Sequence, residues 1–196
     1  ELPEIEKWEP PLPTGSGEII GGYPLKWAPK TDSERIQNLG KHLDTILAGN
    51  WTCTEKIDGS STTAVNTGEE IIVASRNWVV GETDFRYDVL TQLGIIDLLP
   101  AGFAMQGEVF GENIQNNPLQ IKGKDFKAFS LYNDGVFVPY DEWPENLVQF
   151  RVPVLDLEMP QTIEGFVAQV DKMKSTINPQ RNSEGVVWHG GKTHIF

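Results

Sequence analysis

The stretch Thr52-Cys53-Thr54-Glu55-Lys56-Ile57-Asp58-Gly59-Ser60-Ser61 places Lys-x-Asp-Gly at the end of an alternating, threonine-rich segment. The alternation predicts a strand that carries the lysine and turns at Asp58-Gly59 into a second strand. A lysine amine becomes a nucleophile only after it loses its proton, which burial or nearby charge can favour. Gly59 would let the backbone approach a ligand closely. The pattern alone is weak, because a salt-bridged turn at a strand end also explains it.

Composition and charge limit the classes of protein that this chain can belong to. The 196 residues, 39% of them hydrophobic, can form one large domain or two small ones. The single cysteine excludes a disulfide framework or a cysteine-based zinc site within the chain. No membrane span or signal peptide is indicated, and we expect a cytoplasmic protein. The net charge of −12 argues against a broad basic surface for nucleic acid, although Lys122, Lys124 and Lys127 concentrate positive charge locally.

The order of helical and strand patterns predicts an α+β fold in which antiparallel sheets are flanked by helices. Residues 1–29, rich in proline, glycine and tryptophan, predict an N-terminal linker that wraps the edge of a domain formed by residues 30–196. Helices are predicted over residues 30–48, 84–93 and 161–175, the last with Ile163, Phe166, Val167, Val170 and Met173 facing inward. Further strands are predicted over residues 71–77, 103–110, 127–133, 136–138 and 183–189.

Four of these predicted strands carry a charged or aromatic residue that could act with Lys56. Arg76, in Ser75-Arg76-Asn77, is a bidentate donor suited to phosphate or ribose, but it could also be an ordinary surface arginine. Glu108, in Gln106-Gly107-Glu108-Val109-Phe110-Gly111, could accept a ribose hydroxyl or simply pair with a lysine. Phe129 is a candidate stacking surface for a base and otherwise a core residue. Glu184, at the head of Glu184-Gly185-Val186-Val187-Trp188, suits a divalent metal, or is a solvent-facing charge.

Taken together and in this order, the five stretches resemble motifs I, Ia, III, IIIa and IV of the covalent nucleotidyltransferases, which include DNA ligases, RNA ligases and mRNA capping enzymes. Finer resemblance favours an ATP-dependent RNA ligase similar to RNA ligase family 5. It lies in residues 29–38, Pro-Lys-Thr-Asp-Ser-Glu-Arg-Ile-Gln-Asn, and in residues 107–117, Gly-Glu-Val-Phe-Gly-Glu-Asn-Ile-Gln-Asn-Asn. Residues 5–11 resemble the linker that follows an N-terminal OB-fold module in that family.

The resemblance implies a nucleotidyltransferase domain that uses ATP with Mg²⁺ or Mn²⁺ and seals nicked RNA or RNA/DNA duplex ends through a lysyl-AMP. Lys56 would be the nucleophile, and Asp58 would orient it or a hydrated metal. The residues that would bind ATP or AMP are Glu55, at the adenine edge, and Ser61, Arg76, Glu108, Phe129 and Glu184. Glu184 would also contact the metal. Contacts with strand ends would come from Lys30, Arg35 and Asn38.

The chain departs from the family pattern at both ends. No OB module precedes the linker, although we expect one in the full-length protein. The motif V strand, with its essential lysines, would begin where the chain stops at Phe196, and Lys192 is the nearest candidate for such a lysine. Two other readings stay open: a DNA ligase or capping guanylyltransferase relative, and an inactive remnant that binds ATP or nucleic acid.

Overall fold

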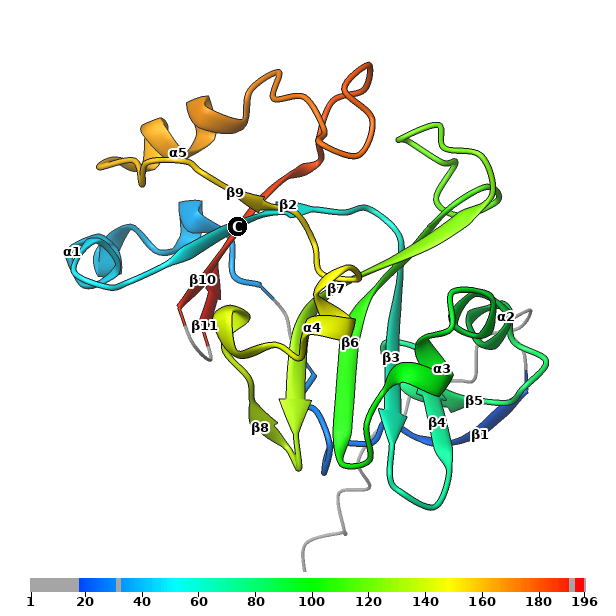
Figure 1. Cartoon of the computed structure of the whole chain (residues 1–196). Coiled ribbons are helices and arrows are strands. Elements are labelled where there is room, and N and C mark those ends of the chain that lie inside the picture. The colour runs from blue at the N-terminus through cyan, green and yellow to red at the C-terminus, as the bar shows by residue number, and fades with distance from the viewer. Residues whose placement is uncertain (1–17, 31–32, 191–192, 196) are drawn as a thin grey trace, which may run out of the picture.

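Two antiparallel sheets form the framework of the protein, in a computed structural model that describes residues 18–30, 33–190 and 193–195 (Figure 1). The larger sheet contains β1 (Ile19–Gly22), β3 (Ser60–Asn66), β4 (Ile71–Ala74), β5 (Trp78–Val80), β6 (Phe103–Gly111), β7 (Lys124–Asn133) and β8 (Val136–Phe137). The smaller sheet contains β2 (Thr52–Lys56), β9 (Val154–Leu155), β10 (Gly185–Gly190) and β11 (Thr193–Ile195). Their strand orders are β1-β5-β4-β3-β6-β7-β8 and β11-β10-β2-β9. The predicted mixture of helices with antiparallel sheets is therefore confirmed.

Short helices pack on each sheet. They are η1 (Ile36–Asn38), η2 (Gly40–His42), α1 (Leu43–Leu47), α2 (Phe85–Gln92), α3 (Ile95–Leu98), η3 (Tyr140–Glu142), α4 (Glu145–Val148) and α5 (Ile163–Val170). Helices α2 and α3 share the largest hydrophobic cluster with β6 and β7, through residues such as Leu90, Ile95 and Phe126. Helices α1 and α5 share a second cluster with β2 and β10, through Ile46, Phe166 and Trp188. Each sheet therefore has its own core.

The strand pair predicted around Lys56 is confirmed, but its two members belong to different sheets. β2 pairs with β9 and β10, whereas β3 pairs with β4 and β6. The chain consequently passes from the smaller sheet to the larger one within residues 57–59, immediately after Lys56. Local alternation could predict both strands, but it contains no information on which partners each strand takes.

The single helix predicted over residues 30–48 is wrong. Residues 31 and 32 lie outside the described part of the chain, and residues 33–35 are not helical. The rest forms η1, a break at Leu39, and then η2, which runs directly into α1. Gly40 directly follows the break at Leu39 and begins η2, and its low helix propensity disfavours a continuous helix. The apolar residues of this segment nevertheless pack as the pattern indicated, because Ile36, Leu39, Leu43 and Ile46 all contact the second core.

The helix predicted over residues 161–175 is shorter than expected. α5 begins after Thr162, whose hydroxyl accepts a hydrogen bond from the Gly165 amide at 3.0 Å, a typical N-cap. It ends before Asp171, and Lys172 adopts a left-handed backbone with φ of 60°. Phe166 is buried as predicted, but Val167 is 44% exposed, so its inward assignment is wrong.

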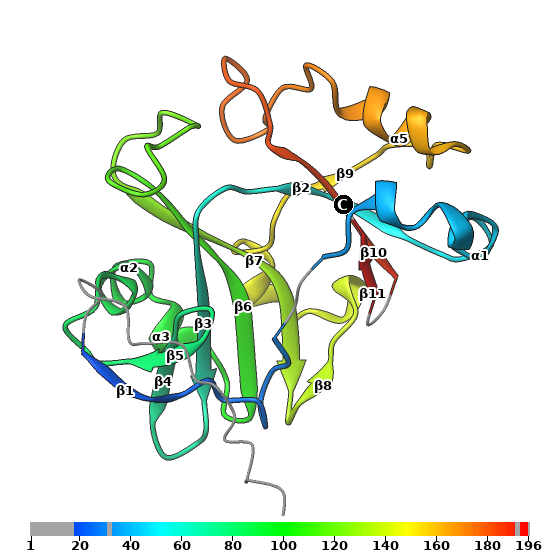
Figure 2. The same ribbon diagram turned by 180° about the vertical axis from the view of Figure 1, so that it is seen from behind.

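Residues 18–29 add a strand to the edge of the larger sheet, as Figure 2 shows from behind. β1 pairs with β5, and the Tyr23 hydroxyl lies 3.0 Å from that of Thr63 and accepts a hydrogen bond from Gln106. Residues 1–17 of the predicted linker lie outside the described residues, and the boundary at residue 29 stays a prediction. In the part of the chain that the structure covers, no helix has the length and apolar character needed to cross a membrane.

Gly107 supports a testable prediction about the larger sheet. A Cβ at this position would collide with the Lys127 carbonyl oxygen and approach the Ala128 Cα to 2.7 Å, where β6 and β7 shift register. We expect Gly107→Ala to lower the free energy of unfolding by about 1–3 kcal/mol, the usual cost of overpacking. Gly22→Ala is the control, because its Cβ would meet nothing within 4 Å. Urea unfolding measures both variants, and equal losses would contradict this role of Gly107.

Candidate active site

Strand alternation in the smaller sheet decides which side chains meet in the candidate site. Residues paired across an antiparallel ladder share a face, so the pairs Thr54–Val187 and Lys56–Gly185 face one way. The pairs Cys53–Trp188 and Glu55–Val186 face the other way, toward the core beside α5. Thr54, Lys56, Val187 and His189 line a cleft of about 580 Å³, which is within the usual size range of ligand sites.

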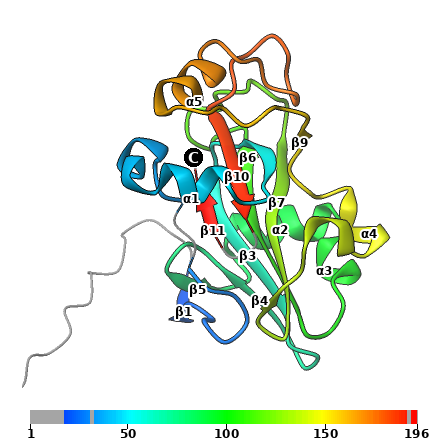
Figure 3. The ribbon, with the colours of Figure 1, turned by 90° about the vertical axis from the view of Figure 1, so that its left-hand side faces the viewer.

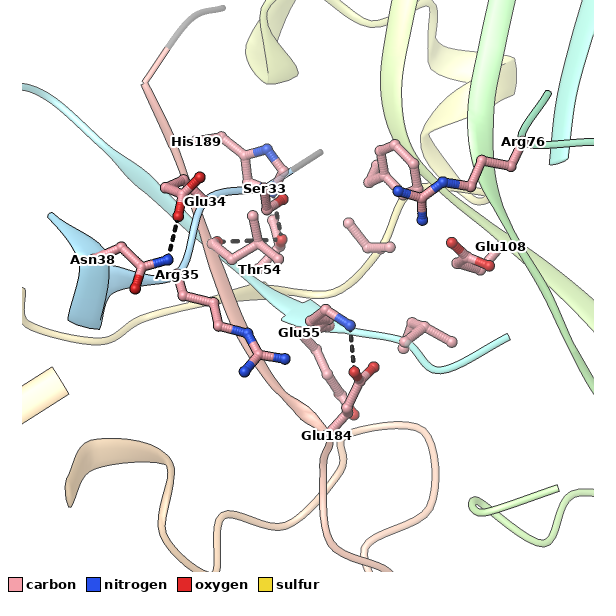
Figure 4. Close-up of a pocket in the computed structure, with 15 residues that line it drawn as sticks. Ser33, Glu34, Arg35, Asn38, Thr54, Glu55, Arg76, Glu108, Glu184 and His189 are labelled. Carbon is pink, nitrogen blue, oxygen red and sulfur yellow. Dashed lines mark hydrogen bonds and ion pairs between the residues drawn. The ribbon is translucent and has the colours of Figure 1, made fainter. Parts of the chain in front are cut away.

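Lys56 lies at the end of β2 and forms an ion pair with Glu184. Figure 4 labels Glu184 and draws this ion pair as a dashed line. Lys56 pairs with Gly185 in the ladder, so the residue immediately before β10 is placed beside the lysine amine although it lies 128 positions away in sequence. The two side chains are 26% and 36% exposed, which leaves both accessible from the cleft. The structure therefore brings together two of the residues predicted from the sequence.

The opposite wall of the cleft comes from the larger sheet. Glu108 extends from β6, Phe129 from β7, and Arg76 follows β4. Figure 4 shows Arg76 and Glu108 facing the strands that carry Thr54, Glu55 and His189. The two sheets thus supply opposite walls, and the predicted partners Arg76, Glu108 and Phe129 all line the same cleft as Lys56.

Three carboxylates, Asp58, Glu108 and Glu184, surround the lysine, and the pKa is raised at two of them, Glu108 and Asp58. Burial raises the pKa of Glu108 to about 8; the charges of Glu184 and Asp58 add to this, while Lys56 and Arg76 oppose it. Burial also raises the pKa of Asp58, helped by Glu184 and opposed by Lys56. Perturbed acids of this kind gather at functional sites because function requires charges to be held close together.

The carboxylates do not form a metal cage by themselves. In the described residues, no group of three or more His, Cys, Asp or Glu side chains is close enough to hold a metal ion. Mg²⁺ commonly takes only one or two protein carboxylates, with water and substrate phosphates completing its octahedron. Glu184, which is accessible from the cleft, fits that mode of binding.

The turn after Lys56 is held tightly against the larger sheet. A Cβ on Gly59 would lie 2.5 Å from the Val109 carbonyl oxygen, so this glycine permits close approach to β6 rather than to a ligand. Arg86, 8% exposed, forms an ion pair with Asp84 at 2.9 Å and donates to the Ser60 hydroxyl at 2.7 Å. Sequence reasoning missed this clamp, because an Asp-x-Arg at a helix start gives no sign of its distant partner.

Glu55 is turned away from the face that carries Lys56. Its Oε2 accepts hydrogen bonds from the amide and the hydroxyl of Thr176, at 2.8 and 2.5 Å. Its Oε1 is buried and has no hydrogen-bond partner. The residue still contributes to the lining of the cleft. The role of Glu55 at an adenine edge stays a prediction, and its observed contact is with the segment that precedes Glu184.

Only some of the remaining predicted site residues line the cleft. Arg35 and Asn38 line the cleft, and Asn38 donates to Glu34 at 2.5 Å. Lys30 does not line it, but donates at 3.0 Å to Asn77, the neighbour of Arg76. Ser61 also lies outside the lining, and its carbonyl accepts a hydrogen bond from Arg86 at 3.1 Å.

A buried polar group at the inner end of the cleft was not foreseen. His189 is 5% exposed, and its Nε2 lies 2.7 Å from the Thr54 hydroxyl and 3.3 Å from that of Tyr140. The Tyr140 hydroxyl donates to the Phe129 carbonyl at 2.5 Å, which connects both walls of the cleft. Thr54 lies two residues before Lys56, so the alternation of a strand could have placed it on the same face. The position of His189 could be predicted only with knowledge of the β2–β10 register.

Known proteins share this fold and part of this sequence. A Lys-to-Met mutant of a Naegleria gruberi RNA ligase with AMP and Mn superposes with a TM-score of 0.81 at 32% identity, over 96% of this chain and 61% of that one. A Lys-to-Ala mutant of the same ligase with ATP and Mn has a TM-score of 0.82 and 32% identity. The ligase with PPi has a TM-score of 0.81 and 33% identity, and the coverage of both chains is the same. This chain thus spans about three fifths of their length, and a search of curated proteins finds no match. The RNA ligase family model matches residues 49–193, which is most of the sequence, so the chain belongs to the RNA ligase family.

Proposed function

We propose that this chain is the nucleotidyltransferase domain, residues 30–196 with the linker before it, of an ATP-dependent RNA ligase. The observation that carries the proposal is the cleft in which Lys56 faces Glu184 on one wall and Arg76, Glu108 and Phe129 on the other. The similar Naegleria structures hold AMP with Mn, ATP with Mn, or PPi, which are the ligands that such a cleft would take. Membership of the RNA ligase family adds the substrate class.

In the first step, the neutral amine of Lys56 attacks the α-phosphorus of ATP. A nitrogen–phosphorus bond forms, the bond from the α-phosphorus to the bridging oxygen of the β-phosphate breaks, and pyrophosphate leaves with that electron pair. The proton lost by the amine passes to solvent or to a nearby carboxylate. Catalysis of this kind depends mainly on positioning and on neutralising phosphate charge. The exposure of the Lys56 side chain to the cleft, 26%, is compatible with attack on a ligand there.

The walls of the cleft suit the other parts of the nucleotide. The half-buried ring of Phe129 can stack on adenine, and Arg76 and Glu108 can hydrogen-bond ribose hydroxyls from the same wall. Glu184 would hold Mg²⁺ or Mn²⁺ together with the phosphates, and that ion would supply positive charge to them. Asp58 would orient the lysine through the charge interaction that already couples the two groups.

In the later steps, the phosphorus of the lysyl-AMP is attacked by the 5′-phosphate of a strand, which frees the Lys56 amine and forms a capped end. A 3′-hydroxyl then attacks the strand phosphorus and AMP leaves, so the strand is sealed. The proposed contacts with these ends are Arg35 and Asn38, which line the cleft, and Lys30, which donates to Asn77 beside Arg76 in sequence. Nicked RNA or RNA/DNA duplexes are the proposed substrates, and the contribution of an OB module in a longer protein belongs to the same proposal.

Replacing Lys56 tests the covalent step directly. We expect both Lys56→Ala and Lys56→Arg to abolish the lysyl-AMP, because alanine has no nucleophile and a guanidinium stays protonated. Transfer of label from [α-³²P]ATP to the protein measures this step. Lys26→Ala, at an exposed lysine outside the cleft, should label like the unaltered protein. Persistent labelling of either Lys56 variant would remove it as the nucleophile.

Phe129 and Phe126 form a matched pair on β7. Phe129 lines the cleft, whereas Phe126 is fully buried in the largest core. We expect Phe129→Leu to weaken ATP binding by about 1–3 kcal/mol, the scale of base–aromatic stacking, with a small change in melting temperature. Phe126→Leu should lower the melting temperature and leave the affinity of the folded protein unchanged. Calorimetric titration measures the ATP affinity of both variants, and thermal unfolding measures their melting temperatures. Unchanged affinity with a lowered melting temperature for Phe129→Leu would show that the base binds elsewhere.

The raised pKa of Glu108 predicts a pH dependence of stability. Its pKa is about 8 in the folded protein against an ordinary value of 4.5, so between these values the folded state keeps a proton that the unfolded chain loses. The free energy of unfolding should therefore fall as the pH rises from about 5 to 8, and Glu108→Gln should weaken that fall. Urea unfolding across this range is the measurement. Glu142→Gln, at an exposed carboxylate outside the cleft, should follow the unaltered profile; a parallel profile for Glu108→Gln would refute the assignment.

A further inference from the structure

Two polar loops, far apart in sequence, meet beside the end of β2. Residues 112–124 run from the end of β6 to the first residue of β7, and residues 171–183 connect α5 to β10; together they are called the ridge. Figures 1 and 3 show both loops at the same end of the molecule. Their contact is direct, because the Asn178 side chain donates to the Leu119 carbonyl at 2.8 Å. The ridge is therefore one surface built from two segments.

The ridge is attached to both residues that flank Lys56. Thr176 binds the Glu55 carboxylate through its amide and its hydroxyl, at 2.8 and 2.5 Å. Leu119 is buried in one hydrophobic cluster with Ile57, and Ile177 packs against that cluster. A molecule held on the ridge would consequently be held in a fixed position relative to the nucleophile.

The chemistry of the ridge differs from that of the chain as a whole. The protein has 16 basic and 28 acidic residues, but the ridge has five basic and two acidic ones. Lys122, Lys124, Lys172 and Lys174 are exposed. An open polar pocket on the ridge is lined by Glu112, Asn113, Gln115, Asn116 and Asn117. Further exposed amide side chains belong to Gln120, Gln180 and Asn182.

We propose that the ridge binds the sugar–phosphate backbone of the RNA strand whose end is presented to Lys56. Lysine ammonium groups and asparagine or glutamine amides are common donors to phosphate and sugar oxygens. Such contacts position a strand and carry no base specificity. The acidic remainder of the chain would repel RNA from other directions and so favour this approach. This inference rests on the proposed function, which supplies RNA as the substrate.

The test removes one lysine from each loop while leaving the cleft unchanged. Lys122→Gln/Lys172→Gln lowers the net charge by two, and Lys172 is 86% exposed, so neither change disturbs the core. Lys26→Glu lowers the net charge by the same amount at the other end of β7, where the Lys26 carbonyl contacts the turn at Gly135. The two ends of β7 are about 30 Å apart, because the strand has ten residues. The control therefore matches the total charge and changes only its location.

Binding of a nicked RNA duplex is measured by fluorescence anisotropy at several salt concentrations, and lysyl-AMP formation is measured separately. We expect the double variant to bind about tenfold more weakly at 0.15 M salt, with a salt slope smaller by about two, while Lys26→Glu stays near the unaltered protein. Lysyl-AMP formation should be equal in all three. Equal binding by the double variant and the control, or no salt-dependent binding by the unaltered protein, overturns the ridge proposal. Absence of lysyl-AMP in the unaltered protein contradicts the proposed function instead.

Discussion

The antiparallel pairing of β2 with β10 is the interaction on which the candidate site depends. It sets Lys56 opposite Gly185 and so places Glu184 beside the lysine amine. The chain joins the larger sheet at Ser60, and Gly59 just before it comes so close to β6 that a side chain would collide with the Val109 carbonyl. The lysine is thus fixed from both directions, by the ladder before it and by the packed turn after it. The proposed attack of Lys56 on phosphorus would benefit from such positioning.

Much of the framework could be predicted from the sequence because it depends on local patterns. Alternation located β2 and β3, and the helix predicted over residues 84–93 matches α2. What local patterns could not provide was the assignment of strands to sheets, since that depends on the pairing of β3 with β6 and of β2 with β10, which lie far apart in sequence. The helix predicted over residues 30–48 was wrong for a related reason. Its apolar spacing correctly indicates that Ile36 and Ile46 are buried, but η1, η2 and α1 bury them as well as one continuous helix would.

The candidate site shows the same division. Charged residues in apolar strands, such as Glu108, were visible in the sequence because a buried charge requires a reason. The inner polar group formed by His189, Thr54 and Tyr140 was not visible, since each member looks ordinary until the register is known. Glu55 shows the opposite case, in which the sequence suggested a role that the observed contact does not support. Adjacency to Lys56 suggested a shared site, whereas the period of a strand turns neighbouring side chains to opposite faces, and Glu55 binds Thr176 there.

The proposed binding of ATP raises a question of charge balance, because the protein is acidic. The cleft is lined by three basic side chains, Arg35, Lys56 and Arg76, and by four acidic ones, Glu34, Glu55, Glu108 and Glu184. With Glu108 holding a proton below pH 8, these groups nearly cancel, and no net positive charge is left for a triphosphate. The proposed substrate would therefore bind poorly as a free anion and well as a complex with a divalent cation, because the cation brings the missing charge and Glu184 gives it a ligand. On this reasoning, the carboxylates around Lys56 favour the metal complex of ATP over free ATP.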